Sequence, residues 1–386
     1  MKEKTQDLQT IIPYKRTFFH KVVDRLYRLF KSTESIKTDP DYFFYGHLKT
    51  SRFPTFRTIK KQIDFKPDVV LVFWVSDFIT NRVIKLLHNR FGSKIIFIPP
   101  DAALFTGGCH YPNRCTNYKT GCNDCPAIIT LSQQWIARSI YIEKSKLLQK
   151  SDYTVVSVSS FLTQMAVSSG ITKNVHLWKQ FVVVDDEVFQ PIKRLTAARN
   201  LSLGANKRYV LLAAAFLKQK RKGILEAVEA LNYVWSQNQD YEVLLIGNAS
   251  DEFEKLYNGE VHVLGYMDPS HLNDLYNISY LYLCPSLEDA GPMMVNQSLM
   301  TGTPVVGFKM GVLPDLIREN ETGCLADLGD IEGLAEGILK LLNLSEGEYL
   351  DMSENCRDLA LKSYSPETIL NNFQRLFNEL SLNSTN

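Results

Sequence analysis

Short apolar runs alternate with amphipathic segments along most of the chain. In the first half, four apolar runs have the length and β-branched content of buried strands, and each of the first three is followed by a segment with helical spacing of its apolar residues. The pattern predicts strands over 69–74, 94–98 and 153–158, an extended stretch over 175–184, and helices over 78–91, 132–150 and 159–168.

The second half repeats this alternation after a boundary at 192–206 that is rich in Lys, Arg, Asn and Ala. The predicted strands are 209–215, 242–247, 261–265, 280–284 and 305–308, and the predicted helices are 223–235, 293–300, 331–342, 345–363 and 366–380. Strands that alternate with helices form parallel sheets covered by those helices. The chain is therefore predicted to be α/β, with two Rossmann-like domains.

Composition and net charge limit the classes of function that this sequence suggests. The 386 residues are 45% hydrophobic and 22% charged, which is typical of a globular protein, and the net charge of +1 gives no electrostatic reason to expect nucleic acid as a partner. The first ten residues are polar and lack the apolar core of a signal peptide, and seven cysteines, an odd number, suit a reducing compartment. We therefore expect a cytoplasmic protein.

Residues 14–32 form a basic amphipathic pattern, with apolar residues on one face and six Lys or Arg residues on the other. Two readings remain open. The segment is either a helix packed on its own domain with a solvated basic face, or a helix that lies on an anionic membrane surface.

The stretch 285–308 follows a predicted strand and carries the strongest sign of a binding site. Glu288 comes directly after the strand, Gly291 and Pro292 form a turn, and a helix-compatible run starts at Met293. Ligands of parallel sheets bind at the carboxyl ends of strands, and free amides at a helix start suit a phosphate or sugar oxygen. The alternative is an ordinary surface loop with a solvated acid.

Four cysteines gather between two predicted elements, at Cys109, Cys115, Cys122 and Cys125. Four thiols at this spacing match the ligand number of a tetrahedral structural zinc site, although C-x5-C-x6-C-x2-C is not a standard finger. Reduced cysteines without a metal are the alternative. No carboxylate and histidine set with an open position points to a catalytic metal.

The stretch 285–308 resembles the donor-site motif of retaining GT-B glycosyltransferases of family 4. On this resemblance, Glu288 matches a glutamate that contacts the donor sugar. Asn296, with Gln297 beside it, stands where a second glutamate holds the ribose. The backbone around Gly291, Pro292, Met293 and Met294 is then expected to hold the donor diphosphate.

Two further segments carry the resemblance. In FLKQKRKG, residues 216–223, Lys222 and Gly223 match the pair that grips the diphosphate; Leu217 replaces the usual arginine, and Lys218 or Arg221 is expected to substitute for it. FTGGCHY, residues 105–111, resembles a cysteine-rich subset of the family. Asp101 matches that subset's acid, which we expect to act with Glu288 in catalysis, whereas Pro100 replaces its histidine.

The resemblance implies a GT-B fold: an acceptor-side domain over 1–192, a nucleotide-sugar domain over 193–365, and a helix over 366–386 that crosses back, with the two parallel sheets facing across a cleft. The implied function is retaining transfer of a sugar from a nucleotide-sugar to a glycan or lipid-linked acceptor, with no cofactor required for the chemistry. A peripheral position at the inner face of the membrane fits such an acceptor.

Two alternatives follow from the positions at which this sequence differs from the family's motifs. Pro100, Leu217, Asn296 and the absence of a glycine-rich loop in residues 1–65 favour a weak or inactive homologue that binds a nucleotide-sugar or a partner transferase without turnover. The second alternative is a metal-bearing scaffold at a membrane surface.

Overall fold

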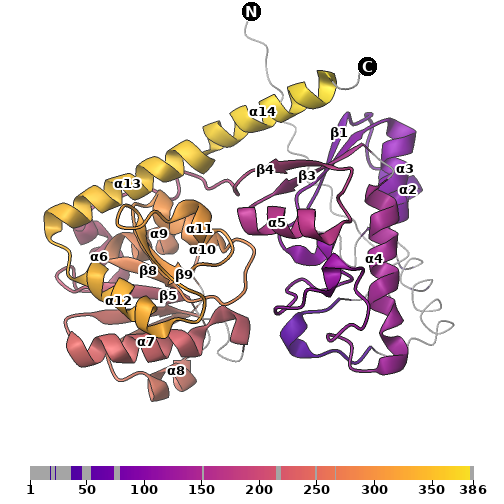
Figure 1. The fold of residues 1–386 in the computed structure, drawn as a ribbon. Coiled ribbons are helices and arrows are strands. Elements are labelled where there is room, and N and C mark those ends of the chain that lie inside the picture. Colours follow the sequence, from indigo (N-terminus) through magenta and orange to yellow (C-terminus); the bar gives the residue numbers. More distant parts are fainter. Residues whose placement is uncertain are drawn as a thin grey trace, which may run out of the picture.

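The computed structural model describes residues 18, 22, 36–45, 54–73, 79–149, 152–213, 219–247, 250–265 and 267–382. Within them the chain forms two α/β units, one from each half of the sequence, joined by an extended segment and by the last helix (Figure 1). The first sheet has the strand order β1-β2-β3-β4 and the second β10-β9-β8-β5-β6-β7, and the pairs within both are parallel.

The first unit confirms the strand predictions of the first half. Its strands are β1 Val69–Val72, β2 Lys94–Phe97, β3 Tyr153–Ser157 and β4 His176–Lys179, and its α-helices are α2 Phe56–Lys60, α3 Asn81–Phe91, α4 Trp135–Leu148 and α5 Ser160–Ser169. Short 3-10 turns lie at Pro40–Tyr42, Ala102–Phe105, Asn117–Lys119 and Leu131–Gln133. The turn at Pro40–Tyr42 falls where the sequence has no strong periodicity. The turn at Leu131–Gln133 falls at the start of the helix predicted over 132–150.

The second unit has six strands: β5 Tyr209–Ala213, β6 Glu242–Ile246, β7 Val261–Gly265, β8 Leu281–Cys284, β9 Val305–Phe308 and β10 Gly323–Ala326. Its helices are α6 Arg194–Leu201, α7 Ile224–Gln237, α8 Ser250–Leu256, α9 Pro269–Ile278, α10 Met293–Met300, α11 Leu313–Leu316, α12 Ile331–Leu342 and α13 Glu346–Tyr364, followed by α14 Pro366–Leu382. A 3-10 turn at Lys220–Lys222 precedes α7.

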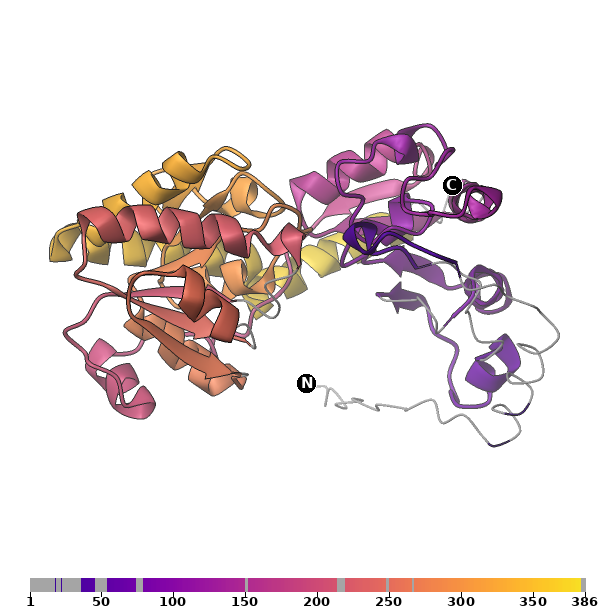
Figure 2. The same cartoon turned by 90° about the horizontal axis from the view of Figure 1, so that it is seen from below.

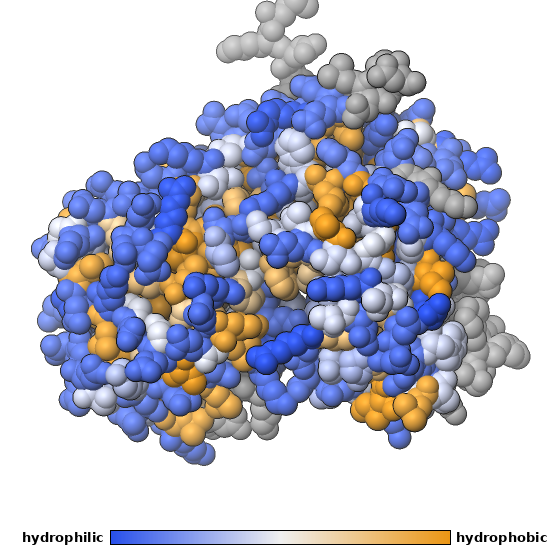
Figure 3. Space-filling view, viewed as in Figure 1, coloured by the Kyte–Doolittle hydropathy of each residue, from blue (hydrophilic) through white to orange (hydrophobic). Residues whose placement is uncertain are grey.

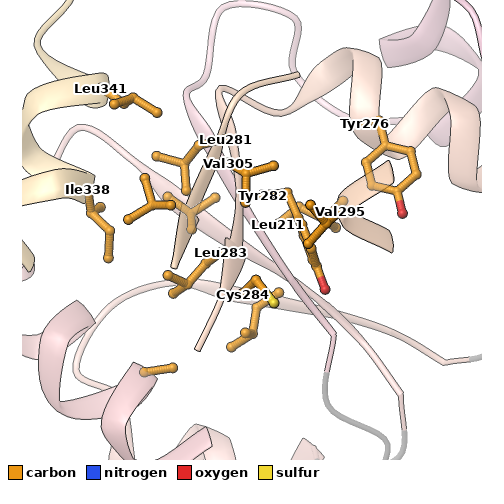
Figure 4. Close-up of a cluster of buried hydrophobic side chains, with 14 of the residues drawn as sticks. Leu211, Tyr276, Leu281, Tyr282, Leu283, Cys284, Val295, Val305, Ile338 and Leu341 are labelled. Atoms are coloured by element: carbon orange, nitrogen blue, oxygen red, sulfur yellow. The ribbon is translucent and has the colours of Figure 1, made fainter. Parts of the chain in front are cut away.

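The central strand β8 explains why apolar runs, and not alternating patterns, mark these strands. Leu281 and Leu283 point towards α12, whereas Tyr282 points to the opposite side, towards Val295 of α10 (Figure 4). Both faces of β8 are buried. A parallel strand that is covered by helices on both sides reads as a continuous apolar run.

The predicted boundary at 192–206 is only partly a linker, because α6 lies within it. Ala197 and Ala198 are buried, and Asn200 Nδ2 donates to the Asp274 carboxylate of α9 at 3.1 Å. The small alanine side chains let α6 pack closely on α9, so α6 belongs to the second unit. The short elements α8, α11 and β10 were also not predicted, since each is too brief to show a clear period.

Helix α14 extends from the second unit across to the first (Figures 1 and 2). Leu376 of α14 is completely buried against Ile96 of β2 and Val156 of β3. Ser365 caps the helix, and its hydroxyl accepts the Thr368 N–H at 3.3 Å. The helix therefore covers one face of the first sheet and links the two units.

Polar contacts of α11 and of the loop after β8 join the two units. Asp315 accepts the Ser160 N–H at the start of α5 and the Lys179 ammonium, each at 2.7 Å. The Ser159 hydroxyl donates to the Ala290 carbonyl at 2.7 Å. Because a carboxylate is favourable at a helix N-terminus, Asp315 fixes α5 beside the stretch 285–292.

On the face seen in Figure 3, apolar residues occur in small patches between polar and charged ones. Over the described ranges, none of the helices is long and apolar enough to cross a membrane. The predicted amphipathic helix at 14–32 lies outside the described residues, except for Phe18 and Val22.

Candidate active site

Two predicted loops meet at the carboxyl edge of the second sheet. Strands β5 and β8 are neighbours, and the turn at 220–222 and the loop at 285–292 follow them in the chain. The Arg221 carbonyl accepts the N–H groups of Leu287 and Glu288 at 2.8 and 3.1 Å. This edge is where ligands of open parallel sheets bind.

Asp289 is the centre of the charged groups at this edge. Its Oδ2 accepts Lys222 Nζ at 2.6 Å and Arg221 Nη1 at 3.4 Å, and its Oδ1 accepts the Ala290 and Gly291 amides at 2.8 and 3.4 Å. Two cations and two amides thus converge on one carboxylate, which itself is buried. This is a set of donors suited to an anion.

Glu288 points to the other unit. Both of its carboxylate oxygens accept the Asn113 N–H, at 2.9 and 3.1 Å. Burial raises the pKa of Glu288 to about 7, against the opposing effects of the Asn113 hydrogen bond and of Arg221. Glu288 is thus a carboxyl group that titrates near neutral pH and faces the space between the units.

That space is a cavity of about 1300 Å³ lined by both units. Asn113, Tyr118 and Phe161 contribute from the first unit, and Arg221, Glu226 and Glu288 contribute from the second. It is large enough for a ligand of several rings, because pockets for drug-sized ligands run from about 300 to 1,000 Å³. The charged groups around Asp289 therefore lie beside a large cleft between two domains.

Comparisons with known proteins agree with this arrangement. Residues 195–359 match the family "Glycosyl transferases group 1". Over these residues, the chain is similar to the group 1 glycosyltransferases. It is 29% identical over 151 residues to the amylovoran biosynthesis glycosyltransferase AmsK of Erwinia amylovora, an alignment that covers 36% of each chain. Across six such relatives, the chain spans from 34% to 68% of the relative's length.

Solved structures establish the GT-B fold. Sucrose-phosphate synthase of Thermosynechococcus elongatus superposes with a TM-score of 0.64 at 17% identity, covering 85% of this chain and 77% of that one. Anabaena HepE, solved in complex with UDP and glucose, superposes with a TM-score of 0.59 at 14% identity, covering 84% and 80%. The two parallel sheets seen here are the two domains of that fold.

Several of the residues predicted for a donor site lie together. Arg221 and Glu288 line the cleft, and Lys222, Arg221 and the Gly291 amide all donate to the Asp289 carboxylate. Helix α10 starts at Met293 with Pro292 as its N-cap and without a side-chain cap. The first amides of the helix, those of Met293 and Met294, therefore lack an intrahelical partner. Lys218 lies outside the described residues.

Asn296 and Gln297, the two residues predicted to hold a ribose, contact tyrosine hydroxyl groups. Asn296 is buried, with its carbonyl accepting the Tyr364 hydroxyl at 2.9 Å, and Gln297 Oε1 accepts the Tyr276 hydroxyl at 3.1 Å. Over the described ranges, neither residue lines the large cavity. The helical phase of α10 explains this, because Val295, Asn296 and Leu299 share its buried face. Ribose binding by Asn296 or Gln297 stays a prediction.

Asp101 is buried in the first unit. It accepts the Ala103 N–H at 2.8 Å and contacts His110 Nδ1 at 2.7 Å, and it lines a separate, smaller cavity. Asp101 therefore holds the loop that carries His110 in place. A role in the transfer reaction stays a prediction.

The four cysteines predicted as metal ligands line one small apolar cavity. Cys109 donates to Cys125, which lowers the pKa of Cys125 to about 7, and the Gly107 N–H donates to Cys122 Sγ at 3.1 Å. In the described part of the chain, no group of three or more His, Cys, Asp or Glu residues is arranged to hold a metal ion. Zinc bound by Cys109, Cys115, Cys122 and Cys125 stays a prediction.

Four residues were not predicted as part of the site: Asn113 and Phe43, which line the cleft, and Asp289 and Tyr111, which contact Arg221. The signal for Asp289 was present, since it is a second acid directly after a strand and beside Glu288. For Asn113 and Phe43 the sequence carries no such signal, because their contacts depend on how the two domains meet.

Gly223 lets the turn at 220–222 approach the loop after β8. Its φ is +65°, and a Cβ atom there would lie 1.8 Å from the Pro285 carbonyl oxygen. We expect Gly223→Ala to lower the free energy of unfolding by about 2–5 kcal/mol, from the positive φ and the overlap together. Gly329→Ala is the control, because Gly329 also has positive φ but no atom within 4 Å of its added Cβ. We expect a loss of about 1 kcal/mol there, and equal losses in denaturant titrations would refute the close approach.

The partly buried Glu288 makes stability depend on pH. Its ordinary pKa of 4.5 rises to about 7 in the folded protein, so the native state binds this proton more tightly than the unfolded chain does. Stability from this group is therefore present below pH 4.5 and is lost as the pH rises to about 7. We expect Glu288→Gln to match the wild type at pH 4.5 and to be more stable at pH 8 by about 1–3 kcal/mol. Denaturant titrations across this range measure the difference, and a difference that does not change with pH would contradict the shift.

Proposed function

We propose that this glycosyltransferase transfers a hexosyl group from a nucleotide-sugar to a glycan or lipid-linked acceptor, with retention at the anomeric carbon. Surface polysaccharide biosynthesis is the process we infer for it. The observation that carries the proposal is the convergence of Lys222, Arg221 and two backbone amides on one carboxylate beside the interdomain cavity. The relative AmsK and the structure of HepE with UDP and glucose support the same class of reaction.

The donor diphosphate is the anion that these groups suit. Its negative charge increases as the bond to the sugar breaks, so cations and amides held in place lower the barrier most at that moment. Lys222 Nζ lies 2.6 Å from an Asp289 oxygen, and this oxygen marks a point in the site where an anion is stabilised. We infer that the diphosphate binds next to Asp289 and shares its two cations.

Glu288 is proposed to orient the sugar. Its carboxylate lines the cavity and accepts the Asn113 N–H, so it already serves as a hydrogen-bond acceptor at the mouth of the site. Sugar hydroxyl groups are donors of the same kind. Fixed cations and amides of the chain itself are proposed to neutralise the leaving group, without a cofactor for the chemistry.

The place of action proposed is the cytoplasm, with peripheral contact at the inner face of the membrane. This rests on the basic pattern of residues 14–32. Sedimentation with anionic and with neutral lipid vesicles tests it, and equal sedimentation with both would argue against an electrostatic membrane contact.

The transfer reaction is tested with a donor panel. UDP-, GDP- and ADP-sugars are each incubated with the protein and with glycan or lipid-linked acceptors, and release of the nucleoside diphosphate is measured. NMR of the product then gives the anomeric configuration. The proposal expects release with one donor class and retention in the product. Inversion would refute the stereochemistry, and no release from any donor would refute the transfer.

A further inference from the structure

Two aromatic rings of the first unit enclose the Arg221 guanidinium of the second unit. The guanidinium carbon lies 4.0 Å from the ring centroid of Tyr111 and 5.0 Å from that of Phe43. The two rings contact each other edge to face, with centroids 5.7 Å apart and an interplanar angle of 87°. A cation within about 6 Å of a ring centroid is attracted to the face of the ring.

The polar contacts of Arg221 are too long to orient it alone. Arg221 Nη1 donates to the Glu288 carbonyl and to Asp289 Oδ2, both at 3.4 Å. Arg221 Nε is buried and has no hydrogen-bond partner in the described part of the chain. Bonds between charged groups are usually about 2.7–2.9 Å long. The direction of the guanidinium is therefore set largely by the two rings.

Phe43 reaches this position through an unfavourable backbone conformation. Its φ and ψ are 43° and 51°, in the left-handed region, which is rare for a bulky residue. The conformation is stabilised by the His110 N–H, which donates to the Phe43 carbonyl at 3.1 Å. Such strain, about 1–3 kcal/mol, persists where surrounding structure imposes it and is concentrated at functional sites.

Two residues near Arg221, Lys220 and Glu288, also contact the first unit, through polar groups. The Asp41 carboxylate contacts Lys220 Nζ at 2.7 Å, and the Asn113 N–H donates to Glu288. The segments 40–45 and 111–113 thus contact Lys220, Arg221 and Glu288 of the second unit. Each contact exists only while the two units are close.

We propose that Tyr111 and Phe43 are positioning residues, which hold Arg221 where the donor diphosphate binds and so complete the diphosphate site only when the cleft is closed. This inference rests on the proposed function. Without the rings, Arg221 has two long polar contacts and room to rotate towards the cavity it lines, and the diphosphate loses an oriented cation.

The test is a double-mutant cycle on nucleotide affinity. UDP, GDP and ADP are titrated calorimetrically into the wild type, and the one that binds is carried through the variants Tyr111→Leu, Arg221→Met and the double variant. We expect Tyr111→Leu to raise Kd about 10-fold in the wild type and less than 2-fold in the Arg221→Met background. Tyr111→Phe keeps the ring and is expected to restore Kd to within about 2-fold.

Tyr118→Leu is the matched control, because Tyr118 lies in the same loop as Tyr111 and lines the cavity that Arg221 also lines. We expect it to leave Kd within about 2-fold of the wild type. A 10-fold effect of Tyr111→Leu in both backgrounds, or an equal effect of Tyr118→Leu, would overturn the positioning role. If none of the nucleotides binds the wild type, the proposed function fails. The contact of the rings with Arg221 is then judged from thermal unfolding of the ligand-free variants, in which additive shifts in Tm would overturn it and non-additive shifts would support it.

Discussion

Replacing Lys222 with alanine is expected to lower kcat/KM for the nucleotide-sugar about 100- to 1,000-fold. The Lys222 ammonium lies 2.6 Å from Asp289 Oδ2 at the point where cations and amides converge. An oriented donor of this kind that stabilises charge developing in the transition state contributes about 10²–10³ in rate. The variant also leaves Asp289 with fewer partners, so the assay is paired with a measurement of its unfolding temperature.

Lys220→Ala is the control for this prediction. Lys220 is two residues away, is largely exposed, and pairs with Asp41 of the first unit. We expect its loss to change kcat/KM less than about 3-fold, because exposed ion pairs contribute about 0–1 kcal/mol. Similar losses in both variants would mean that the general positive charge of this turn matters, and not the contact made by Lys222.

Replacing Glu288 with alanine is expected to lower transfer about 10- to 150-fold while leaving the affinity for the free nucleoside diphosphate within about 3-fold. A hydrogen bond to a charged group contributes about 1.5–3 kcal/mol, which gives the first range. Glu288 lies at the cavity, with its oxygens on the Asn113 N–H, and is not part of the cation set around Asp289. The sugar is thus proposed to contact Glu288, and the diphosphate is proposed to contact the cations around Asp289.

Glu226→Ala is the matched control for Glu288→Ala. Glu226 lies in the first turn of α7 and lines the same cavity, so it tests whether any negative charge in the cleft has this effect. We expect its loss to change transfer less than about 3-fold. A Glu288→Ala variant that loses affinity for the free nucleotide as strongly as it loses transfer would contradict the separate roles.

Much of the donor edge could be predicted because a parallel sheet brings distant loops together. Apolar runs located β5 and β8, and the rule that ligands bind at the carboxyl ends of strands placed Lys222 and Glu288 at one edge. The same rule does not say which of two adjacent acids faces the lysine. That depends on the turn after β8, in which Asp289 points to Lys222 and Glu288 points to Asn113.

The contacts across the cleft could not be predicted from local patterns. Phe43 lies in a segment without helical or strand periodicity, and its left-handed conformation is not one that a phenylalanine favours. Tyr111 was part of a recognised motif, yet its contact with Arg221 depends on the placement of two domains. The sequence pattern also did not show that the phase of α10 buries Asn296, whose contact with a ribose stays a prediction.

The donor site is tested most directly by calorimetric titration of the wild type, Lys222→Ala and Glu288→Ala with UDP, GDP and ADP and with their sugar conjugates. We expect one nucleoside diphosphate and its conjugate to bind the wild type, Lys222→Ala to weaken both, and Glu288→Ala to weaken only the conjugate. Binding that is unchanged in both variants, or no binding by any of the ligands, would contradict a donor site at Lys222 and Glu288.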